Sequence, residues 1–393
     1  MRRLSRGLGA LASGTLALSM IATQAAAQQS AAIPAYQPQT EEERGLWMEM
    51  DEAERTLKTS RFVIRDPELN DYLRGVLCRE VGAERCQAAR IYIVRTPYFN
   101  ASMAPNGMMQ VWTGLLLRMR NEAQLAAVIG HEFAHFEKKH SLENFRNLRG
   151  KTDAMAWLSF FGLVGAVAQV GVLGSIFEFS RDMERDADTI SITYMRGGGY
   201  APRAASDIWA QVVSEGDARA AARQQKRRRH EGGGFLDSHP ASADRMKYLA
   251  ELTREVPGGA VGGGFAGADE YRTALAKWWP ALIDDQIKLN DFGGTEYLLG
   301  NMASSAGWTG DLLYARAELY RARGGPGDFE AAIGFYREAL AQSYDLPELR
   351  RGLGLALLRT GGTDEGRELL RQYIALRPEA ADRPMMTMLA GGR

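Results

Sequence analysis

Residues 131–135, His-Glu-Phe-Ala-His, combine two histidines and a glutamate at the spacing of a metal site. On a helix, His131 and His135 lie one turn apart on the same face, where both imidazoles can reach one zinc ion. Glu132 projects beside that face, and its carboxylate can accept a proton from metal-bound water and pass it to a leaving amine. We therefore predict two zinc ligands and a general base. The alternative is a chance match on a buried helix, which leaves both histidines unexplained.

The segment SRDMERDAD, residues 180–188, offers a third ligand. A catalytic zinc needs three protein ligands and one open position. We predict that Glu184 is this ligand. We also predict that Asp188, one helical turn later, accepts a histidine N–H and so fixes the tautomer of that ring. Taken alone, two acids four residues apart are usually a solvated helix face, but downstream of H-E-x-x-H they favour the metal site.

Further segments extend these motifs: Asn100-Ala101, QVWTGLL (110–116), NEAQLAAVIGHEFAH (121–135) and SHPASADRM (238–246). Together they resemble the zinc metallopeptidase family of CAAX prenyl protease and HtpX, and within it the periplasmic members that carry C-terminal repeats. The resemblance covers roughly Leu46 to Glu255. It implies a zincin-like peptidase fold with one Zn²⁺ per chain.

The resemblance also implies roles that spacing alone does not assign. His239 and Arg245 match positions that line the active site, and we list both as catalytic. His239 would stabilise the oxyanion or occupy the open zinc position in a latent state, although without the resemblance it would be a loop histidine. An extended substrate would add as a strand along an edge formed by Asn100 and Ala101 and the strand at 108–113, with its residues Gln110, Val111 and Trp112.

Two other histidines are predicted to be structural. His140 is expected to end the helix that carries the metal motif, where a cation suits the helix dipole. His230 belongs to the basic run 226–230, which is a solvated loop or, as the alternative, a contact with an anionic surface.

The N-terminus predicts export from the cytoplasm. Arg2, Arg3 and Arg6 precede an apolar stretch at 8–25 and an A-x-A-like site at 25–27, so residues 1–27 are interpreted as a signal peptide. An uncleaved anchor is the alternative. No cysteine lies near the cleavage site, so lipoprotein processing is not expected.

The chain has only two cysteines, Cys78 and Cys86. In an oxidising compartment a small disulfide loop is expected, with two buried thiols as the alternative. Lysine plus arginine and aspartate plus glutamate are both 48, so no global charge points to nucleic acid.

Hydrophobic periodicity predicts an α+β peptidase domain, mainly helical with a small sheet. Helices are expected at 41–58, 69–80, 121–140, 182–195 and 202–215, and strands at 89–97 and 108–113. The domain boundaries are placed at 28–45 for a loose N-terminal segment, 46–255 for the peptidase, 256–268 for a Gly-rich linker and 269–393 for a repeat domain.

The C-terminal region is predicted to be an all-α domain of tetratricopeptide-like repeats, with a plain bundle of α-hairpins as the alternative. Two blocks place small and aromatic residues at the repeat positions: Ala317, Tyr320, Ala332, Tyr336 and Ala339 in the first, and Gly354, Leu357, Gly366, Leu370 and Pro378 in the second.

The apolar stretch Ala154 to Phe179 is long enough to cross a bilayer. A single crossing would put Glu184 on the opposite side from His131 and His135, and a membrane cannot divide the ligands of one zinc. We therefore expect this stretch to pack over the site or to contact a membrane peripherally.

These features lead to one functional hypothesis and two rivals. The first is a periplasmic zinc endopeptidase that degrades unfolded or misassembled proteins of the outer membrane, with repeats that dock substrate or the outer-membrane assembly machinery. The second is a chaperone-like scaffold with latent protease activity. A prenyl-protein processing protease is disfavoured, because a signal peptide separates the site from cytosolic clients.

Overall fold

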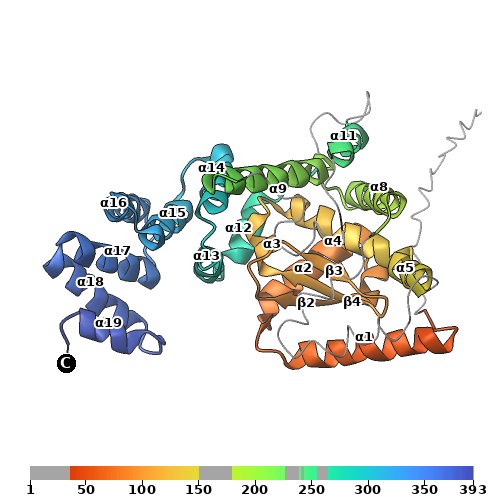
Figure 1. Cartoon of the computed structure of the whole chain (residues 1–393), viewed down its shortest axis with the longest axis horizontal. Helices are drawn as coiled ribbons and strands as arrows, with labels where there is room; N and C mark the ends of the chain where they lie inside the picture. Colours follow the sequence, from red (N-terminus) through yellow and green to blue (C-terminus); the bar gives the residue numbers. More distant parts are fainter. Residues whose placement is uncertain (1–35, 150–178, 226–238, 240–242, 255–263, 393) are drawn as a thin grey trace, which may run out of the picture.

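The computed structural model describes residues 36–149, 179–225, 239, 243–254 and 264–392 (Figure 1). Within these ranges, helices surround a small four-stranded sheet and continue into a helical C-terminal region. The predicted signal peptide, the basic run 226–230 and all of the apolar stretch except Phe179 lie outside the described residues. Among the helices that the structure describes, none is long and apolar enough to cross a membrane.

The sheet consists of β1 (Val63–Ile64), β2 (Arg90–Val94), β3 (Ala101–Met103) and β4 (Met108–Trp112), in the order β1-β2-β4-β3. The pair β2 and β4 is parallel, and the other two pairs are antiparallel. Side chains alternate between the two faces of a strand. Trp112 therefore packs with Leu57 of helix α1 on one face, while Met109 and Val111 join the core formed with helices α2 and α4 on the other.

The strand order corrects one prediction. Because β2 and β3 pair with β4 on both sides, Gln110, Val111 and Trp112 lie in the middle of the sheet and cannot accept an added strand. The edge on this side is β3, which begins at Ala101 directly after Asn100.

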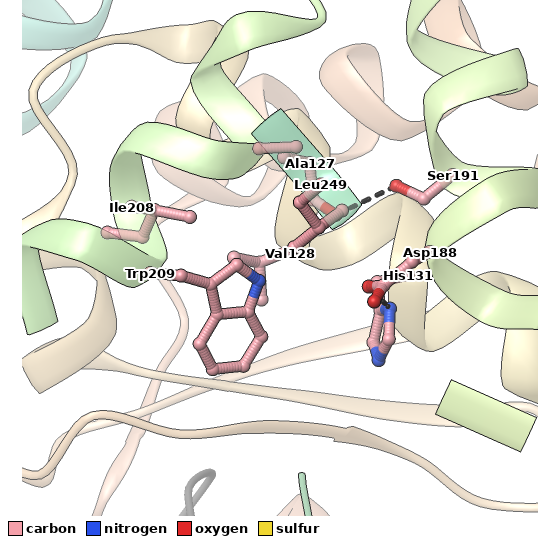
Figure 2. A pocket seen from close by; sticks show the side chains of 9 residues that line it. Ala127, Val128, His131, Asp188, Ser191, Ile208, Trp209 and Leu249 are labelled. Atoms are coloured by element: carbon pink, nitrogen blue, oxygen red, sulfur yellow. Dashed lines mark hydrogen bonds and ion pairs between the residues drawn. The ribbon is translucent and has the colours of Figure 1, made fainter. Parts of the chain in front are cut away.

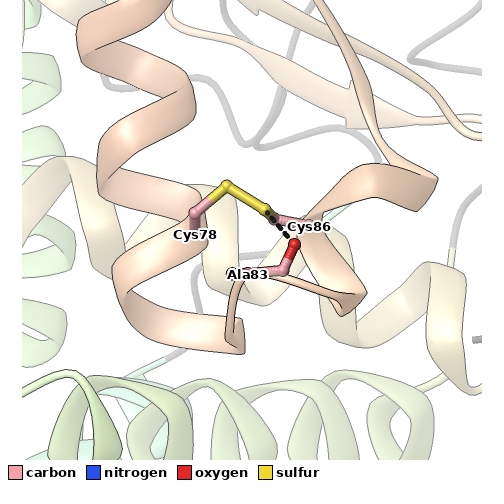
Figure 3. The surroundings of a disulfide bond; sticks show 3 residues. All are labelled: Cys78, Ala83 and Cys86. Carbon is pink, nitrogen blue, oxygen red and sulfur yellow. Dashed lines mark hydrogen bonds between the residues drawn. A yellow bond between two sulfur atoms is a disulfide. The ribbon is translucent and has the colours of Figure 1, made fainter. Parts of the chain in front are cut away.

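Helices α1 (Glu41–Thr59) and α2 (Pro67–Val81) begin at side-chain caps, with Thr40 accepting from the Glu43 N–H and Asp66 from the Leu69 N–H. Helix α1 confirms the helix predicted at 41–58, so the last five residues of the predicted loose segment 28–45 are helical. After α2, Gly82 takes a left-handed φ of 90°, and the turn brings Cys86 of the short 3-10 helix η1 (Arg85–Ala88) back to Cys78. The two cysteines form a disulfide (Figure 3).

The helices that carry the metal motifs pack against one another. Helix α4 (Glu122–Glu137) is preceded by α3 (Thr113–Arg118) and followed by α5 (His140–Arg149). Helix α8 (Arg181–Gly197) and helix α9 (Arg203–Ala222) both contact α4, and α11 (Ala243–Leu252) contacts α8 and α9. Asn121 caps α4 by accepting from the Gln124 N–H, as its sequence position predicts.

The predicted linker 256–268 is wrong at its C-terminal end. Carbonyls of Ala266 and Gly267 accept the first N–H groups of α4, those of Ala123 and Glu122, at 3.0 and 3.1 Å. Helix N-termini leave these donors without partners inside the helix. The segment at 264–267 is therefore part of the peptidase domain, because it completes the start of the metal helix.

The C-terminal region is a series of helices: α12 (Ala268–Leu275), α13 (Trp279–Ile287), α14 (Phe292–Ala306), α15 (Gly310–Arg323), α16 (Asp328–Ala341), α17 (Pro347–Thr360), α18 (Thr363–Leu376) and α19 (Arg383–Leu389). The pairs α15/α16 and α17/α18 pack closely. A Cβ on Gly354 would lie 2.9 Å from the carbonyl oxygen of Gly366, so only glycine allows this approach of α17 and α18. Their identity as tetratricopeptide repeats stays a prediction.

A buried ion pair joins the peptidase helices to this region. Arg118 of α3 donates to both carboxylate oxygens of Glu215 on α9, at 2.8 and 2.6 Å, and to Gln286 of α13 at 3.2 Å. Helices α9 and α14 also lie side by side (Figure 1). The first C-terminal helices are therefore packed against the peptidase through buried charge.

Candidate metal centre

Helix α4 holds the three residues of the H-E-x-x-H motif in the interior. His131, Glu132 and His135 are all 3% exposed or less. The two histidines contact each other through their Nε2 atoms, which lie 3.0 Å apart. Ionisable groups are rarely buried to this extent unless they are paired or bind a metal.

Two more residues bring donor atoms to the same point. Glu184 of α8 lies 3.6 Å from His131 Nε2 and 3.5 Å from His135 Nε2 through its two carboxylate oxygens. His239 Nδ1 lies 3.3 Å from His131 Nε2 and 2.7 Å from Glu184 Oε1. One donor atom from each of the four residues lies within 4.8 Å of all the others.

This arrangement fits a zinc ion. Ligands bound at about 2.0–2.2 Å around a tetrahedral zinc are about 3.3–3.5 Å apart, close to the separations between most of these donors. The other ring nitrogens face outward: His131 Nδ1 lies 2.9 Å from Asp188 Oδ1, and His135 Nδ1 lies 3.0 Å from His140 Nδ1. With a proton on each outward Nδ1, the Nε2 lone pairs of His131 and His135 face each other. A cation between the two lone pairs would stabilise this arrangement. Imidazole and carboxylate donors suit zinc.

Arg245 of α11 holds Asp188, the outward partner of His131. Its guanidinium donates to both oxygens of Asp188, at 2.8 and 2.7 Å, and forms an ion pair with Glu184. It also stacks over the Trp209 ring at 4.0 Å. Arg245 was predicted to be catalytic, and its guanidinium bridges the two carboxylates.

Electrostatics keep both carboxylates ionised. Burial would raise the pKa of Asp188, but the charges of Arg245 and His131 lower it to about 2. Burial would likewise raise the pKa of Glu184, and the charges of His239 and Arg245 hold it well below its usual range. Burial also lowers the pKa of His135, which favours the neutral ring that a metal needs.

Glu132 has a different environment from the other carboxylates. Burial raises its pKa, and its Oε1 has no hydrogen-bond partner among the described residues. The nearest ionisable partner is His239, whose Nε2 lies 3.4 Å from Glu132 Oε1. A buried carboxylate with a free acceptor and a raised pKa suits a general base.

His239 lies between the carboxylates of Glu184 and Glu132. Burial would lower its pKa, but the carboxylates of Glu184 and Glu132 raise it. Its position between these two groups makes it either a fourth donor to an ion or a hydrogen-bond partner of Glu184. The sequence left both the oxyanion role and the latent role of His239 open.

Sequence reasoning missed His140. It was predicted to be a structural residue that ends the metal helix, but α4 stops at Glu137 and His140 begins α5, 5% exposed and directly against His135. Phe179 stacks on the face of the His135 ring, at a centroid distance of 4.0 Å. A third histidine five residues after His135 was the available signal.

A small cavity lies beside His131 (Figure 2). Asp188 and Ser191 of α8 and Trp209 of α9 line it, and the Ser191 hydroxyl donates to the Ala127 carbonyl at 2.9 Å. Apolar side chains form the rest of its wall. Such a wall keeps solvent away from the carboxylate that orients His131.

Comparison with known proteins agrees with this geometry. Residues 64–253 match the sequence profile of peptidase family M48. This stretch is an M48 peptidase domain. The match confirms the predicted family, and zinc is the metal that such peptidases use.

Several curated relatives match the M48 domain. Mitochondrial metalloendopeptidase OMA1 of Arabidopsis thaliana is 30% identical over 44% of this chain and 35% of its own length. The putative beta-barrel assembly-enhancing protease of Vibrio cholerae is 24% identical over 52% of this chain and 43% of its own length. Metalloprotease LoiP of Escherichia coli is 28% identical over 39% of this chain and 58% of its own length. The chain thus spans less than two thirds of the length of these relatives.

Proposed function

We propose that this protein is a zinc-dependent metalloendopeptidase. The observation that carries the proposal is the convergence of His131, His135 and Glu184 on one point, with the buried carboxylate of Glu132 beside it. Zinc held by these three residues would lower the pKa of a water molecule and polarise a scissile carbonyl. Glu132 would take the proton of that water and deliver it to the leaving amine.

The remaining residues of the site would hold this arrangement. Asp188 would fix the tautomer of His131, because it lies 2.9 Å from Nδ1, so that Nε2 is the nitrogen that faces the metal. Arg245 compensates the charges of Asp188 and Glu184 in the interior. Neither residue needs to contact the substrate for these roles.

We propose that the described arrangement is a latent form. With His239 as the fourth donor, the metal has no open position for water, and closed four-ligand sites are typical of structural rather than catalytic zinc. Cleavage then requires His239 to leave. Its replacement by alanine should raise peptidase activity, whereas an oxyanion role for His239 predicts that activity falls.

The substrate edge is proposed at β3. Ala101 and Met103 of this strand are buried against the core, while its outer backbone edge pairs with no strand among those described. An extended polypeptide could add there through backbone hydrogen bonds, which accept many sequences and therefore suit unfolded clients.

The biological setting is proposed from the N-terminal sequence and from the names of two relatives. The predicted signal peptide favours the periplasm, and two relatives are named beta-barrel assembly-enhancing proteases. Misassembled outer-membrane proteins would be the clients, with the C-terminal helices docking clients or the assembly machinery. Membrane contact through residues 154–179 is part of the same proposal.

A chaperone-like scaffold with latent protease activity is the second candidate, and the position of His239 favours it. The two candidates differ in whether client assembly in cells needs Glu132. Deleting residues 269–393 does not separate them, because it would remove Gln286 and expose the buried pair Arg118–Glu215.

The peptidase proposal is tested by cleavage of a fluorescently labelled unfolded protein by the purified full chain. Glu132→Gln should abolish cleavage, whereas Glu143→Gln, on the exposed face of α5, should leave it unchanged. His239→Ala is assayed in parallel, so that an inert wild type can be assigned to latency. If the wild type and His239→Ala are both inert while loaded with zinc, the peptidase proposal is wrong.

A further inference from the structure

We infer that His140 is a positioning residue for the metal: it accepts a hydrogen bond from His135 and so fixes the tautomer that presents His135 Nε2 to zinc. The inference rests on the proposed zinc site and assigns a role that neither the motif nor the family match gives. Its basis is the 3.0 Å contact between His140 Nδ1 and His135 Nδ1, both in buried rings.

The two nitrogens in contact cannot have the same role. A neutral imidazole carries one proton, and a ring that binds metal through Nε2 carries this proton on Nδ1. His135 Nδ1 is therefore the donor and His140 Nδ1 the acceptor. His140 then holds its own proton on Nε2, so both rings are neutral and the contact is a normal hydrogen bond.

The backbone between the two histidines produces this contact. If α4 continued, residue 140 would point away from residue 135, because five residues correspond to about 140° around a helix. Instead, Lys139 adopts a left-handed φ of 60°, which is uncommon for a residue other than glycine. Its N–H still bonds the Phe136 carbonyl at 3.0 Å, so the helix is closed by a sharp turn and His140 folds back onto His135.

The choice of a histidine, rather than an acid, follows from the charge of the site. His131 already has a carboxylate partner in Asp188, which Arg245 compensates. Glu132 and Glu184 bring two more carboxylates to the buried site. A further carboxylate at position 140 would add to the acidic groups buried there, which is unfavourable. A neutral acceptor orients His135 without this charge.

Two rings hold His135, one through its Nδ1 edge and one against its face. The His140 ring meets it at a steep angle of 73° and a centroid distance of 4.9 Å, while Phe179 stacks on it at 28°. His140 supplies the polar contact and Phe179 the apolar one. Removal of the acceptor should therefore free the tautomer of His135 even where packing is kept.

The test compares two side chains of almost the same shape at position 140. Asn offers an oxygen where His has Nδ1, whereas Leu fills the same space with no acceptor. Zinc affinity of the full chain is measured by competition with a chromophoric chelator. His140→Leu should bind zinc about 10- to 100-fold more weakly than wild type, the usual effect of losing an outer partner of a ligand. His140→Asn should remain closer to wild type than to His140→Leu.

The controls separate positioning from folding. Melting curves in excess chelator show whether each variant folds without metal. Lys139→Gly should keep wild-type zinc affinity, because glycine adopts the same left-handed φ freely. If His140→Leu does not fold, His140→Asn decides: wild-type affinity supports the inference, and a large loss overturns it.

The outcomes also distinguish this inference from the proposed function. A wild type that binds no zinc overturns both. A wild type that binds zinc while a folded His140→Leu binds it equally well overturns only the role of His140. Equal losses in His140→Leu and His140→Asn would also overturn it, because they would indicate packing rather than a hydrogen bond.

Discussion

Replacing Glu80 with methionine should stabilise the protein near neutral pH. Glu80 lies on α2 with 6% exposure, and neither of its carboxylate oxygens has a hydrogen-bond partner among the described residues. It packs against Gly130 of the metal helix, where a Cβ would come within 2.9 Å of Glu80 Oε2. Burial alone raises the pKa of this carboxyl well above its usual range.

The pH dependence gives the magnitude. Below the unfolded-state pKa of about 4.3, Glu80 is protonated in both states and adds no pH dependence. As the pH rises above this value, the unfolded chain releases the proton but the folded chain keeps it. The wild type therefore loses about 1.4 kcal/mol of unfolding free energy per pH unit until the raised folded-state pKa is reached. Methionine has a similar volume and no proton, so Glu80→Met avoids this loss.

Urea unfolding followed by tryptophan fluorescence measures the effect between about pH 5 and pH 7. Excess chelator is present, because metal binding is itself linked to pH. The gain in unfolding free energy of Glu80→Met over wild type should grow with pH. The control Glu84→Met, at an exposed position four residues later, should show no such trend. A difference between Glu80→Met and wild type that does not change with pH would refute the reasoning.

Three further predictions concern other parts of the molecule. Arg118→Met alone should destabilise the protein by about 3–5 kcal/mol in urea unfolding, because a single change leaves a buried charge without its partner. Adding Glu215→Leu should recover most of this loss, and additive losses would count against the pair. Removing the disulfide with Cys78→Ala and Cys86→Ala should lower unfolding free energy by about 2.5 kcal/mol, as expected for closing a loop of this length, whereas an unchanged denaturation midpoint would show that the bond contributes nothing. Arg245→Lys should weaken zinc binding, because lysine cannot bridge both carboxylates with a planar fork, and unchanged affinity in a chelator competition would argue against bridging.

The parts of the fold that depend on neighbouring residues could be predicted from the sequence. Thr40 and Asn121 begin helices where their side chains cap the first turn, and strand β2 forms where β-branched and aromatic residues follow one another. The metal motif follows the same local rule, because i and i+4 spacing brings His131 and His135 to one helix face.

The parts that depend on distant pairing could not be predicted. Strand periodicity does not reveal which strand lies at an edge, so the position of Gln110 in the middle of the sheet required the actual strand order. Composition makes Ala266 and Gly267 look like linker residues, although their carbonyls complete the metal helix. His140 was missed because its role depends on the left-handed turn at Lys139, which sequence does not signal for a lysine.

Zinc content is the measurement that tests the central claim most directly. Metal analysis of the purified full chain should find about one zinc per chain in the wild type and in Glu132→Gln, because Glu132 is a base and not a ligand. Glu184→Ala should lose most of this zinc. A wild type without zinc, or a Glu132→Gln variant that loses zinc as Glu184→Ala does, would contradict the proposed metal centre.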